Sequence, residues 1–263
     1  MKFALVDNLK FEATRGLKGL CPSCGSELIA KCGTVKINHW AHKGTRNCDP
    51  WWENETEWHR TWKNNFSTEW QETILTDELN GEKHIADIRT IHGLVIEFQH
   101  SYIDPVERTK REKFYKHMVW VVDATRLKRD YPRLLKGKGD LLRTNKQGIF
   151  STSFPDECFP SAWVDNFVPV IFDFKGIEII SDPKDFRNHL YYLFPKSNTR
   201  ERYIAILSRQ AIINDIISGE FLKQNKEPIK QVEQPPLNRI PLTPQRQSQY
   251  VFEKGRYVKR RRF

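Results

Sequence analysis

The chain has 263 residues, and 43 Lys and Arg against 33 Asp and Glu give it a formal net charge of +10. This length accommodates one large domain or two small ones, and 38% hydrophobic residues, with 8 Trp and 16 Phe, exclude wholesale disorder. The first residues soon reach a charge, and no later stretch has the roughly 18 uncharged apolar residues of a membrane span. We therefore expect a soluble, cytoplasmic protein with no membrane partner.

Residues 1–50 are predicted to form short strands that carry a cysteine and histidine cluster. A C-x-x-C turn at Cys21 and Cys24 is followed by His39-Trp-Ala-His42 and then by Cys48. Thiolates and imidazoles at such spacings are the ligands of structural zinc, which predicts a small zinc ribbon. The favoured ligands are Cys21, Cys24, His39 and His42. Cys48 is the alternative to either histidine, because residues three apart on an extended strand point to opposite faces.

Two further alternatives concern this cluster. Cys32, on the intervening hairpin, is expected to be a small buried hydrophobic residue. A cluster that holds no metal, with buried or redox-active cysteines, also remains open.

Residues 51–125 begin with a predicted helix. Asn54 is the expected N-cap and Glu57 the N3 residue of a capping box, and Trp58, Trp62 and Phe66 form an apolar stripe at helical spacing. Beside that stripe lies a polar edge of three residues with the same spacing: Glu55, His59 and Lys63. This edge can reach a site at the border of a sheet, or it can be an ordinary solvated face.

Three strands are predicted next, at residues 71–77, 84–89 and 94–101. In the third, alternation separates an apolar core face from a face that presents Glu97, Gln99 and Ser101 in a row. A turn near His92 brings Asp87 and Glu97 side by side, and two carboxylates with a strand carbonyl suit Mg²⁺ or Mn²⁺. The alternative pairs Asp87 with Arg89 or Lys83 and gives Glu97 a structural salt bridge.

A second helix is predicted from Asp104 as N-cap, with Pro105 in the first position, to about Lys116. Residues 118–123 then read as a buried parallel strand reached by a right-handed crossover. The fold class is therefore α/β, with the order helix, three-strand meander, helix, parallel strand. Arg108 and Arg111 on the second helix are candidates for phosphate contacts, or for a solvated helix face.

The rest of the chain is divided into residues 126–218, of unknown role, and a basic tail at 219–263. The first part is expected to contain a glycine-containing loop at 136–139, a strand at 168–174 and a final helix with isoleucines from Ile204 to Ile217. The tail, rich in Pro and Gln, has eleven basic residues against four acidic ones. Its end, with Lys259, Arg260, Arg261 and Arg262, suits nucleic acid, although a merely solvating tail is equally compatible.

Seven motifs in chain order resemble those of the competence protein CoiA-like family. They are Cys-Pro-x-Cys-Gly, His-Trp-Ala-His, Glu-Thr-Glu-Trp-His, Ala-Asp-Ile, Ile-Glu-Phe-Gln-His-Ser, Glu-Arg and Val-Trp-Val-Val-Asp, all within residues 1–125. The resemblance implies a PD-(D/E)XK nuclease core, with the element order given above.

The resemblance also implies roles for individual residues. Glu55 and His59 match the glutamate and histidine of the family's helix motif, Asp87 the metal-binding aspartate and Glu97 the glutamate of the E-x-K element. Gln99 stands at the position of that element's lysine, and a neutral amide cannot supply the lysine's charge, so Lys63 or His59 would take over that role.

Two classes of function follow. The first is an Mg²⁺- or Mn²⁺-dependent deoxyribonuclease that acts in DNA uptake and recombination, repair or defence. Asp87 and Glu97 would bind the metal with help from Glu55, Gln99 would position the attacking water, and His59 and Lys63 would orient or stabilise the phosphate. The expected DNA contacts are Ser101, Arg108, Arg111 and the tail. The second is a DNA-binding accessory protein that keeps the nuclease fold, cuts poorly and recruits recombination or defence proteins through its C-terminal region. An RNA-processing factor is a third possibility, because phosphate contacts do not distinguish the sugars.

Overall fold

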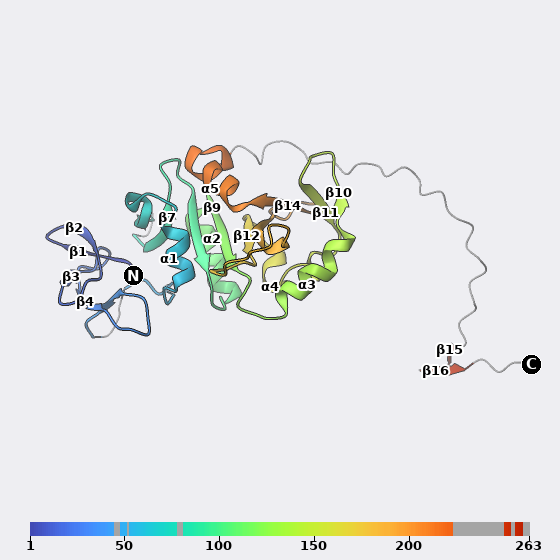
Figure 1. Ribbon diagram of the computed structural model, residues 1–263, viewed down its shortest axis with the longest axis horizontal. Helices are drawn as coiled ribbons and strands as arrows, with labels where there is room; N and C mark the ends of the chain where they lie inside the picture. The colour runs from blue at the N-terminus through green and yellow to red at the C-terminus, as the bar shows by residue number, and fades with distance from the viewer. Residues whose placement is uncertain (45–47, 52, 78–80, 223–249, 254–255, 260–263) are drawn as a thin grey trace, which may run out of the picture. The chain divides into compact units, whose positions relative to one another are not determined.

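The computed structural model describes residues 1–44, 48–51, 53–77, 81–222, 250–253 and 256–259 (Figure 1). The chain divides into two compact units, residues 1–231 and 232–263. In the second unit, β15 (Tyr250–Glu253) and β16 (Arg256–Lys259) form an antiparallel hairpin. The side chain of Lys259 and residues Arg260, Arg261 and Arg262 lie outside the described residues, so the predicted DNA contacts of the tail stay a prediction.

The N-terminal segment forms an antiparallel five-stranded sheet in the order β2-β1-β3-β4-β5. Its strands are β1 (Phe3–Val6), β2 (Leu9–Glu12), β3 (Lys18–Leu20), β4 (Glu27–Lys31) and β5 (His39–His42). Asp7 and Asn8 connect β1 to β2 with positive φ angles of 49° and 64°, which Asp and Asn tolerate better than most residues in a two-residue hairpin. A small core that includes Ala4, Leu28 and Trp40 holds this sheet together.

The central element is a nine-stranded sheet in the order β10-β11-β14-β13-β12-β9-β8-β7-β6. Its strands are β6 (Gln71–Thr76), β7 (Lys83–Arg89), β8 (Val95–Gln99), β9 (Met118–Asp123), β10 (Leu142–Arg143), β11 (Ile149–Thr152), β12 (Val170–Asp173), β13 (His189–Leu193) and β14 (Arg202–Ser208). Strand β9 pairs parallel with β8 and with β12, and the other neighbours are antiparallel. The boundary predicted after residue 125 therefore falls inside one continuous sheet, to which residues 126–218 contribute five strands.

Helices cover both faces of this sheet, so the fold is mixed α/β. One face packs against α1 (Glu57–Lys63) and α5 (Arg209–Ser218), through a cluster that includes Trp58, Trp62 and Ile212. The other packs against α2 (Pro105–Tyr115), α3 (Asp130–Gly137) and α4 (Ser161–Val164), through a cluster that includes Leu134 and Trp163. Within the described residues, no helix is long and apolar enough to cross a membrane.

The predicted element order from residue 57 to residue 123 is confirmed: helix, three strands, helix, parallel strand. The start of the first helix is different from the prediction. Thr56, not Asn54, is the N-cap: its hydroxyl accepts the backbone N–H of His59, while the His59 ring accepts the backbone N–H of Thr56. This reciprocal pair satisfies two helix-end donors, and it leaves Glu55 in the loop before the helix.

The prediction was wrong at two places in residues 126–218. Ile204 and Ile206 belong to strand β14, and helix α5 begins only at Arg209, with Ser208 as its cap. Residues 136–139 are not a loop, because α3 runs to Gly137 and a 3₁₀ turn follows. Gly137 is needed there: a Cβ atom would lie 2.5 Å from the carbonyl oxygen of Glu157.

The third strand of the meander is also more buried than predicted. Leu94, Ile96 and Phe98 do face one core cluster, but Val95 faces the other, and Glu97 and Gln99 are 4% and 3% exposed. Both faces of β8 are covered because α2 packs on the side expected to be open. Glu97 is thus a buried acid.

Candidate active site and metal centre

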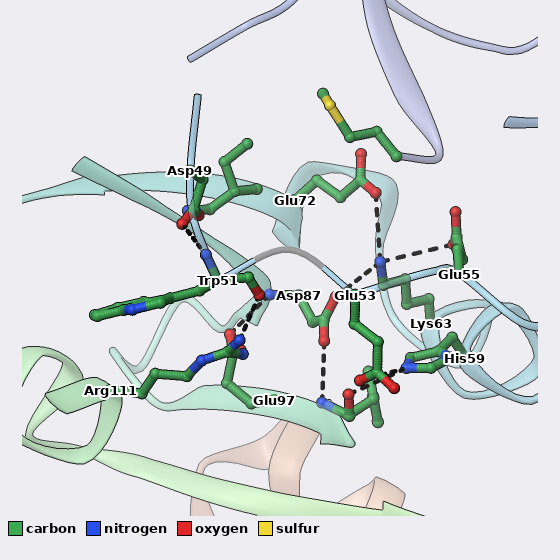
Figure 2. Close-up of a pocket in the computed structure, with 13 residues that line it drawn as sticks. Asp49, Trp51, Glu53, Glu55, His59, Lys63, Glu72, Asp87, Glu97 and Arg111 are labelled. Atoms are coloured by element: carbon green, nitrogen blue, oxygen red, sulfur yellow. Dashed lines mark hydrogen bonds and ion pairs between the residues drawn. The ribbon is translucent and has the colours of Figure 1, made fainter. Parts of the chain in front are cut away.

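A pocket lined by acidic side chains lies where the N-terminal segment, α1, α2 and strands β6 to β8 meet (Figure 2). Its lining residues are Met1, Asp49, Trp51, Glu53, Glu55, His59, Lys63, Glu72, Ile85, Asp87, Glu97, Phe98 and Arg111. We call it the carboxylate pocket. It contains five of the six residues predicted to be catalytic, all except Gln99.

Asp87 and Glu97 lie side by side on β7 and β8, as the turn predicted. The ladder between β7 and β8 pairs Ile88 with Ile96. Beyond that pair, the carboxylates of the two acids take the place of backbone carbonyls as hydrogen-bond acceptors. The Glu97 Oε1 accepts the N–H of Asp87 at 3.1 Å, and the Asp87 Oδ2 accepts the N–H of Phe98 at 3.0 Å. These reciprocal bonds satisfy backbone donors that the ladder leaves unpaired, and they fix both carboxylates at the pocket wall.

Lys63 carries the positive charge at the centre of the pocket. Its Nζ lies 2.8 Å from Asp87, 3.3 Å from Glu72 and 3.6 Å from Glu55 (Figure 2). Burial alone would lower the pKa of this ammonium, but the three carboxylates outweigh burial and raise the pKa well above its ordinary value. Asp87 therefore pairs with Lys63, and not with Arg89 or Lys83 as in the alternative prediction.

Among the acids of the carboxylate pocket, Glu97 has the pKa that is raised furthest. Burial, followed by repulsion from Asp87, raises its pKa to about 8, although Arg111 opposes the rise. The Arg111 guanidinium lies 3.2 Å from Glu97 and also bonds Glu107 and the carbonyl of Trp51. A carboxyl that is mainly protonated at neutral pH in an acidic pocket is typical of functional sites.

His59 and Glu53 form the pocket wall nearest to the end of β8. The Nδ1 atom of His59 accepts the Thr56 N–H, so the proton lies on Nε2, which donates to the carbonyl of Phe98 at 3.1 Å. Glu53 lies 3.6 Å from the same ring and accepts the backbone N–H groups of His100 and Ser101. Burial would raise the pKa of Glu53, but the bonds from His59 and Ser101 keep it below its ordinary value.

The charges of the pocket do not balance. Six carboxyl groups line it, from Asp49, Glu53, Glu55, Glu72, Asp87 and Glu97, against the basic side chains of Lys63 and Arg111. Outside the lining, Arg60 pairs with Glu55 at 3.1 Å and His84 bonds Asp49 at 2.8 Å, which leaves a smaller excess of acids. Hard carboxylate oxygens in such excess suit a divalent cation. Among the described residues, however, Glu55, Asp87 and Glu97 do not bring three oxygen atoms within 4.8 Å of one another, since the Lys63 ammonium lies between Glu55 and Asp87.

Three predicted site residues lie outside the pocket: the DNA contacts Arg108 and Ser101 and the catalytic candidate Gln99. Arg108 is buried against Trp163 and donates to the carbonyls of Ala162 and Asp165, so it holds α4 and does not face a phosphate. Ser101 is exposed, and its backbone N–H is bound by Glu53. The amide of Gln99 donates to Ser101, and its Oε1 is buried without a hydrogen-bond partner among the described residues.

The sequence analysis did not single out three pocket acids: Asp49, Glu53 and Glu72. The backbone of Glu72 has a φ angle of 47°, which is uncommon outside glycine. The Glu72 carboxylate accepts the backbone N–H groups of Lys2 and Phe3 at 2.6 and 3.0 Å. It thereby ties the N-terminal sheet to Lys63. The alternation of glutamates at 53, 55 and 57 was a signal for Glu53, whereas nothing local distinguishes Asp49 or Glu72.

A second group of chemically active side chains gathers in the N-terminal segment. Cys21, Cys24, His42 and Cys48 each offer one sulfur or nitrogen atom, all within 4.8 Å of one another. The Cys21 and Cys48 sulfurs are 3.7 Å apart, and Cys24 Sγ lies 3.3 Å from His42 Nε2. Tetrahedral zinc with Zn–S bonds of about 2.3 Å separates two sulfurs by about 3.8 Å, so this group can hold a structural zinc ion.

His39 is not part of that group, which corrects the favoured ligand set. The Nδ1 atom of His39 bonds the carbonyl of Ile37 at 2.9 Å, and Cys48 occupies the fourth position. The reason is the pleat of β5, whose residues three apart point to opposite faces. Cys32 is half-buried, packs against the small core and donates to the carbonyl of Ala13.

The zinc-type group and the carboxylate pocket share one short segment. Asp49 follows Cys48 directly, and its carboxylate accepts the N–H of Ile85 at 2.8 Å and bonds His84 at 2.8 Å. Trp51 stacks on the His84 ring at 3.2 Å between centroids. The segment that supplies the fourth ligand is therefore bonded to β7, the strand that carries Asp87.

Comparisons with known proteins agree with the motifs. Residues 8–50 match the family model described as competence protein CoiA, N-terminal domain. Competence protein CoiA of Bacillus subtilis (strain 168) is 30% identical in a match 120 residues long that covers 41% of this chain. The match spans 32%, about a third, of that protein's length. No solved structure matches the chain. The resemblance to the CoiA-like family is thereby confirmed.

Proposed function

We propose that this CoiA-like chain hydrolyses phosphodiester bonds of DNA with the help of Mg²⁺ or Mn²⁺. The observation that carries the proposal is the excess of carboxyl groups in the carboxylate pocket, where burial and then the neighbouring Asp87 raise the pKa of Glu97. Such a pocket repels a phosphate unless a divalent cation neutralises it. Asp87 and Glu97 would hold that cation.

The arrangement of elements supports a PD-(D/E)XK type of core. Helix α1, the meander β6 to β8, helix α2 and the parallel strand β9 occur in the order typical of that core. The two acids occupy the second and third strands of the meander, where they can act on the same phosphate. The additional strands β10 to β14 extend the sheet on the side away from the meander.

Individual side chains can divide the work of hydrolysis. When bound, the cation lowers the charge of the phosphate and the pKa of an attacking water. Lys63, already inside the pocket, would supply the positive charge that the neutral Gln99 lacks, by donating to a phosphate oxygen. His59 holds the carbonyl of Phe98, and Glu53 holds the backbone of Ser101, so both are positioning residues for the end of β8.

The zinc-type group would have a structural role in this function. Four protein ligands leave no open coordination position, so zinc there would stabilise the N-terminal sheet and fix the segment that carries Asp49. Competence, the word in the relative's name, is the biological setting that we propose for the activity.

The direct test is cleavage of linear and circular DNA, single- and double-stranded, with Mg²⁺ or Mn²⁺. We expect metal-dependent cutting by the wild type, and its loss in Asp87→Asn and in Glu97→Gln. The matched control is Glu112→Gln, a buried acid outside the pocket that bonds Trp120 and Arg108 and should keep its activity if it folds.

Each variant must be shown to be folded and to bind as much zinc as the wild type. A folded, zinc-loaded wild type that binds DNA but cuts none of these substrates would refute the nuclease proposal and favour the accessory protein.

A further inference from the structure

A second cleft lies at the carboxyl ends of the parallel strands β8 and β9. It has a volume of about 210 Å³ and is lined by residues that come from segments 100–103, 122–133 and 160–163, Lys128 not among them. Ligands of α/β sheets commonly bind at this end of parallel strands. None of its lining residues lines the carboxylate pocket.

Basic side chains dominate the cleft. Arg126, Arg129 and Arg133 line it, from the turn after β9 into α3, and we call it the arginine cleft. Arg126 and Arg129 are exposed, and neither guanidinium group forms a hydrogen bond or ion pair within the part of the chain that the structure describes. Arg133 pairs with Asp130 at 3.2 Å. Two guanidinium groups thus remain free to bind a ligand.

The acids of the cleft are already engaged. Asp123 bonds the ring of His100 at 2.8 Å and the hydroxyl of Thr125 at 2.6 Å, and Asp130 pairs with Arg133. The bond with Asp123, its main cause, raises the pKa of His100, which favours a positive charge there. The free capacity of the cleft is therefore for an anion, and the planar guanidinium fork fits a phosphate oxygen pair.

An exposed aromatic side chain in the arginine cleft favours a nucleic acid strand over a simple anion as the ligand. Tyr102 lines the same cleft and is 67% exposed, although its ring is large and mostly apolar. Exposed aromatic rings beside arginines are how single-stranded nucleic acids are bound, by base stacking and phosphate contacts together.

The arginine cleft and the carboxylate pocket are joined by direct contacts. Glu53, in the wall of the pocket, accepts the N–H groups of His100 and Ser101, which line the cleft. The His59 ring of the pocket lies 6.2 Å, centroid to centroid, from the His100 ring of the cleft. Since one DNA strand carries a phosphate every ~3.4 Å along the helix axis, phosphates only a few nucleotides apart can occupy both.

We propose that the arginine cleft binds a phosphate of the same DNA strand, a few nucleotides away from the phosphate that is cleaved, with Arg126 and Arg129 on that phosphate and Tyr102 on a neighbouring base. This rests on the proposed DNA substrate but not on its hydrolysis. It assigns DNA binding to the basic segment after β9, whereas the sequence analysis gave this task to Ser101, Arg108, Arg111 and the tail.

The test compares two double variants of the full chain. Arg126→Ala with Arg129→Ala removes the cleft charges, and Lys128→Ala with Lys136→Ala removes two exposed charges of the same segment that do not line the cleft. Binding of a fluorescein-labelled single-stranded 15-mer is measured by anisotropy over a range of salt concentrations, with Ca²⁺ in place of Mg²⁺.

We expect the arginine variant to bind at least tenfold more weakly, with a salt slope about 0.7 smaller, since one phosphate contact on a single strand is lost and each contributes about 0.7. The lysine variant should stay within threefold of the wild type. Equal losses in both variants, or no loss in the arginine variant, would overturn the proposal.

A second pair of variants tests stacking without changing charge. Tyr102→Ala should weaken binding at least fivefold, whereas Phe167→Ala, which removes a ring that is 68% exposed elsewhere, should not. Equal effects would refute the role of Tyr102.

The two proposals fail in different ways. If the wild type does not cut DNA but its binding depends on Arg126 and Arg129, the proposal for the arginine cleft stands and the proposal of hydrolysis is refuted. If the wild type cuts DNA but binds it independently of these arginines, only the proposal for the arginine cleft is refuted.

Discussion

The buried, protonated Glu97 predicts an unusual dependence of stability on pH. Its pKa is raised from 4.5 to about 8 by burial and by Asp87. Between these values the folded protein binds one proton more than the unfolded chain does. This stabilising contribution is therefore complete below pH 4.5 and is lost as the pH rises towards 8.

The size of the effect follows from the same two values. At about 1.4 kcal/mol for each pH unit, the free energy of unfolding falls by about 5 kcal/mol over the whole interval. About half of this fall, roughly 2–3 kcal/mol, lies between pH 5.5 and 7.5. Glu97→Gln keeps the volume and an oxygen acceptor for the Asp87 N–H, but it cannot ionise, so this part of the pH dependence should disappear.

The assay is urea unfolding followed by tryptophan fluorescence, in buffers without Mg²⁺ or Mn²⁺ and without chelator, so that any bound zinc stays in place. Other groups, including the histidines, also titrate in this range, so the measured quantity is the wild-type free energy minus that of Glu97→Gln. We expect this difference to fall by about 2–3 kcal/mol from pH 5.5 to 7.5. A difference that stays constant within about 0.5 kcal/mol would refute a buried, protonated Glu97.

Three further predictions concern other charges and ligands. Cys48→Ser should lower the bound zinc well below one ion per chain, measured by atomic absorption, whereas Cys32→Ser should retain it, because only Cys48 is in the ligand group; equal zinc in both would exclude Cys48 as a ligand. Lys63→Met should lower the free energy of unfolding at neutral pH by about 3–5 kcal/mol, since three buried carboxylates lose their shared partner, and a change below about 1 kcal/mol would contradict this. Asp173→Asn should cost about 3 kcal/mol and alter tryptophan fluorescence, because Asp173 accepts both indole N–H groups of α1 and pairs with Arg209; unchanged fluorescence would argue against these contacts.

The sequence by itself determined the features that depend on local spacing. Hydrophobic periodicity gave the order of elements from residue 57 to 123, and the turn near His92 gave the pairing of Asp87 with Glu97. The C-x-x-C turn, followed by His42 and Cys48, predicted the zinc-type group, with Cys48 as an alternative ligand. These are decided within a strand, a turn or a helix, so the chain shows them directly.

Tertiary structure alone decided which polar groups face one another. Lys63 comes from α1, Glu72 from β6 and Asp87 from β7, and only their packing makes Lys63 the shared partner of these acids. Arg108 and Arg111 lie three residues apart on the same helix, α2. Arg108 nevertheless packs against α4, whereas Arg111 pairs with Glu97.

The fate of each charge depends on the surface that the sheet and the other helices bring against it. That surface comes from residues far apart in the chain, such as α4 beside α2, and no local pattern encodes it.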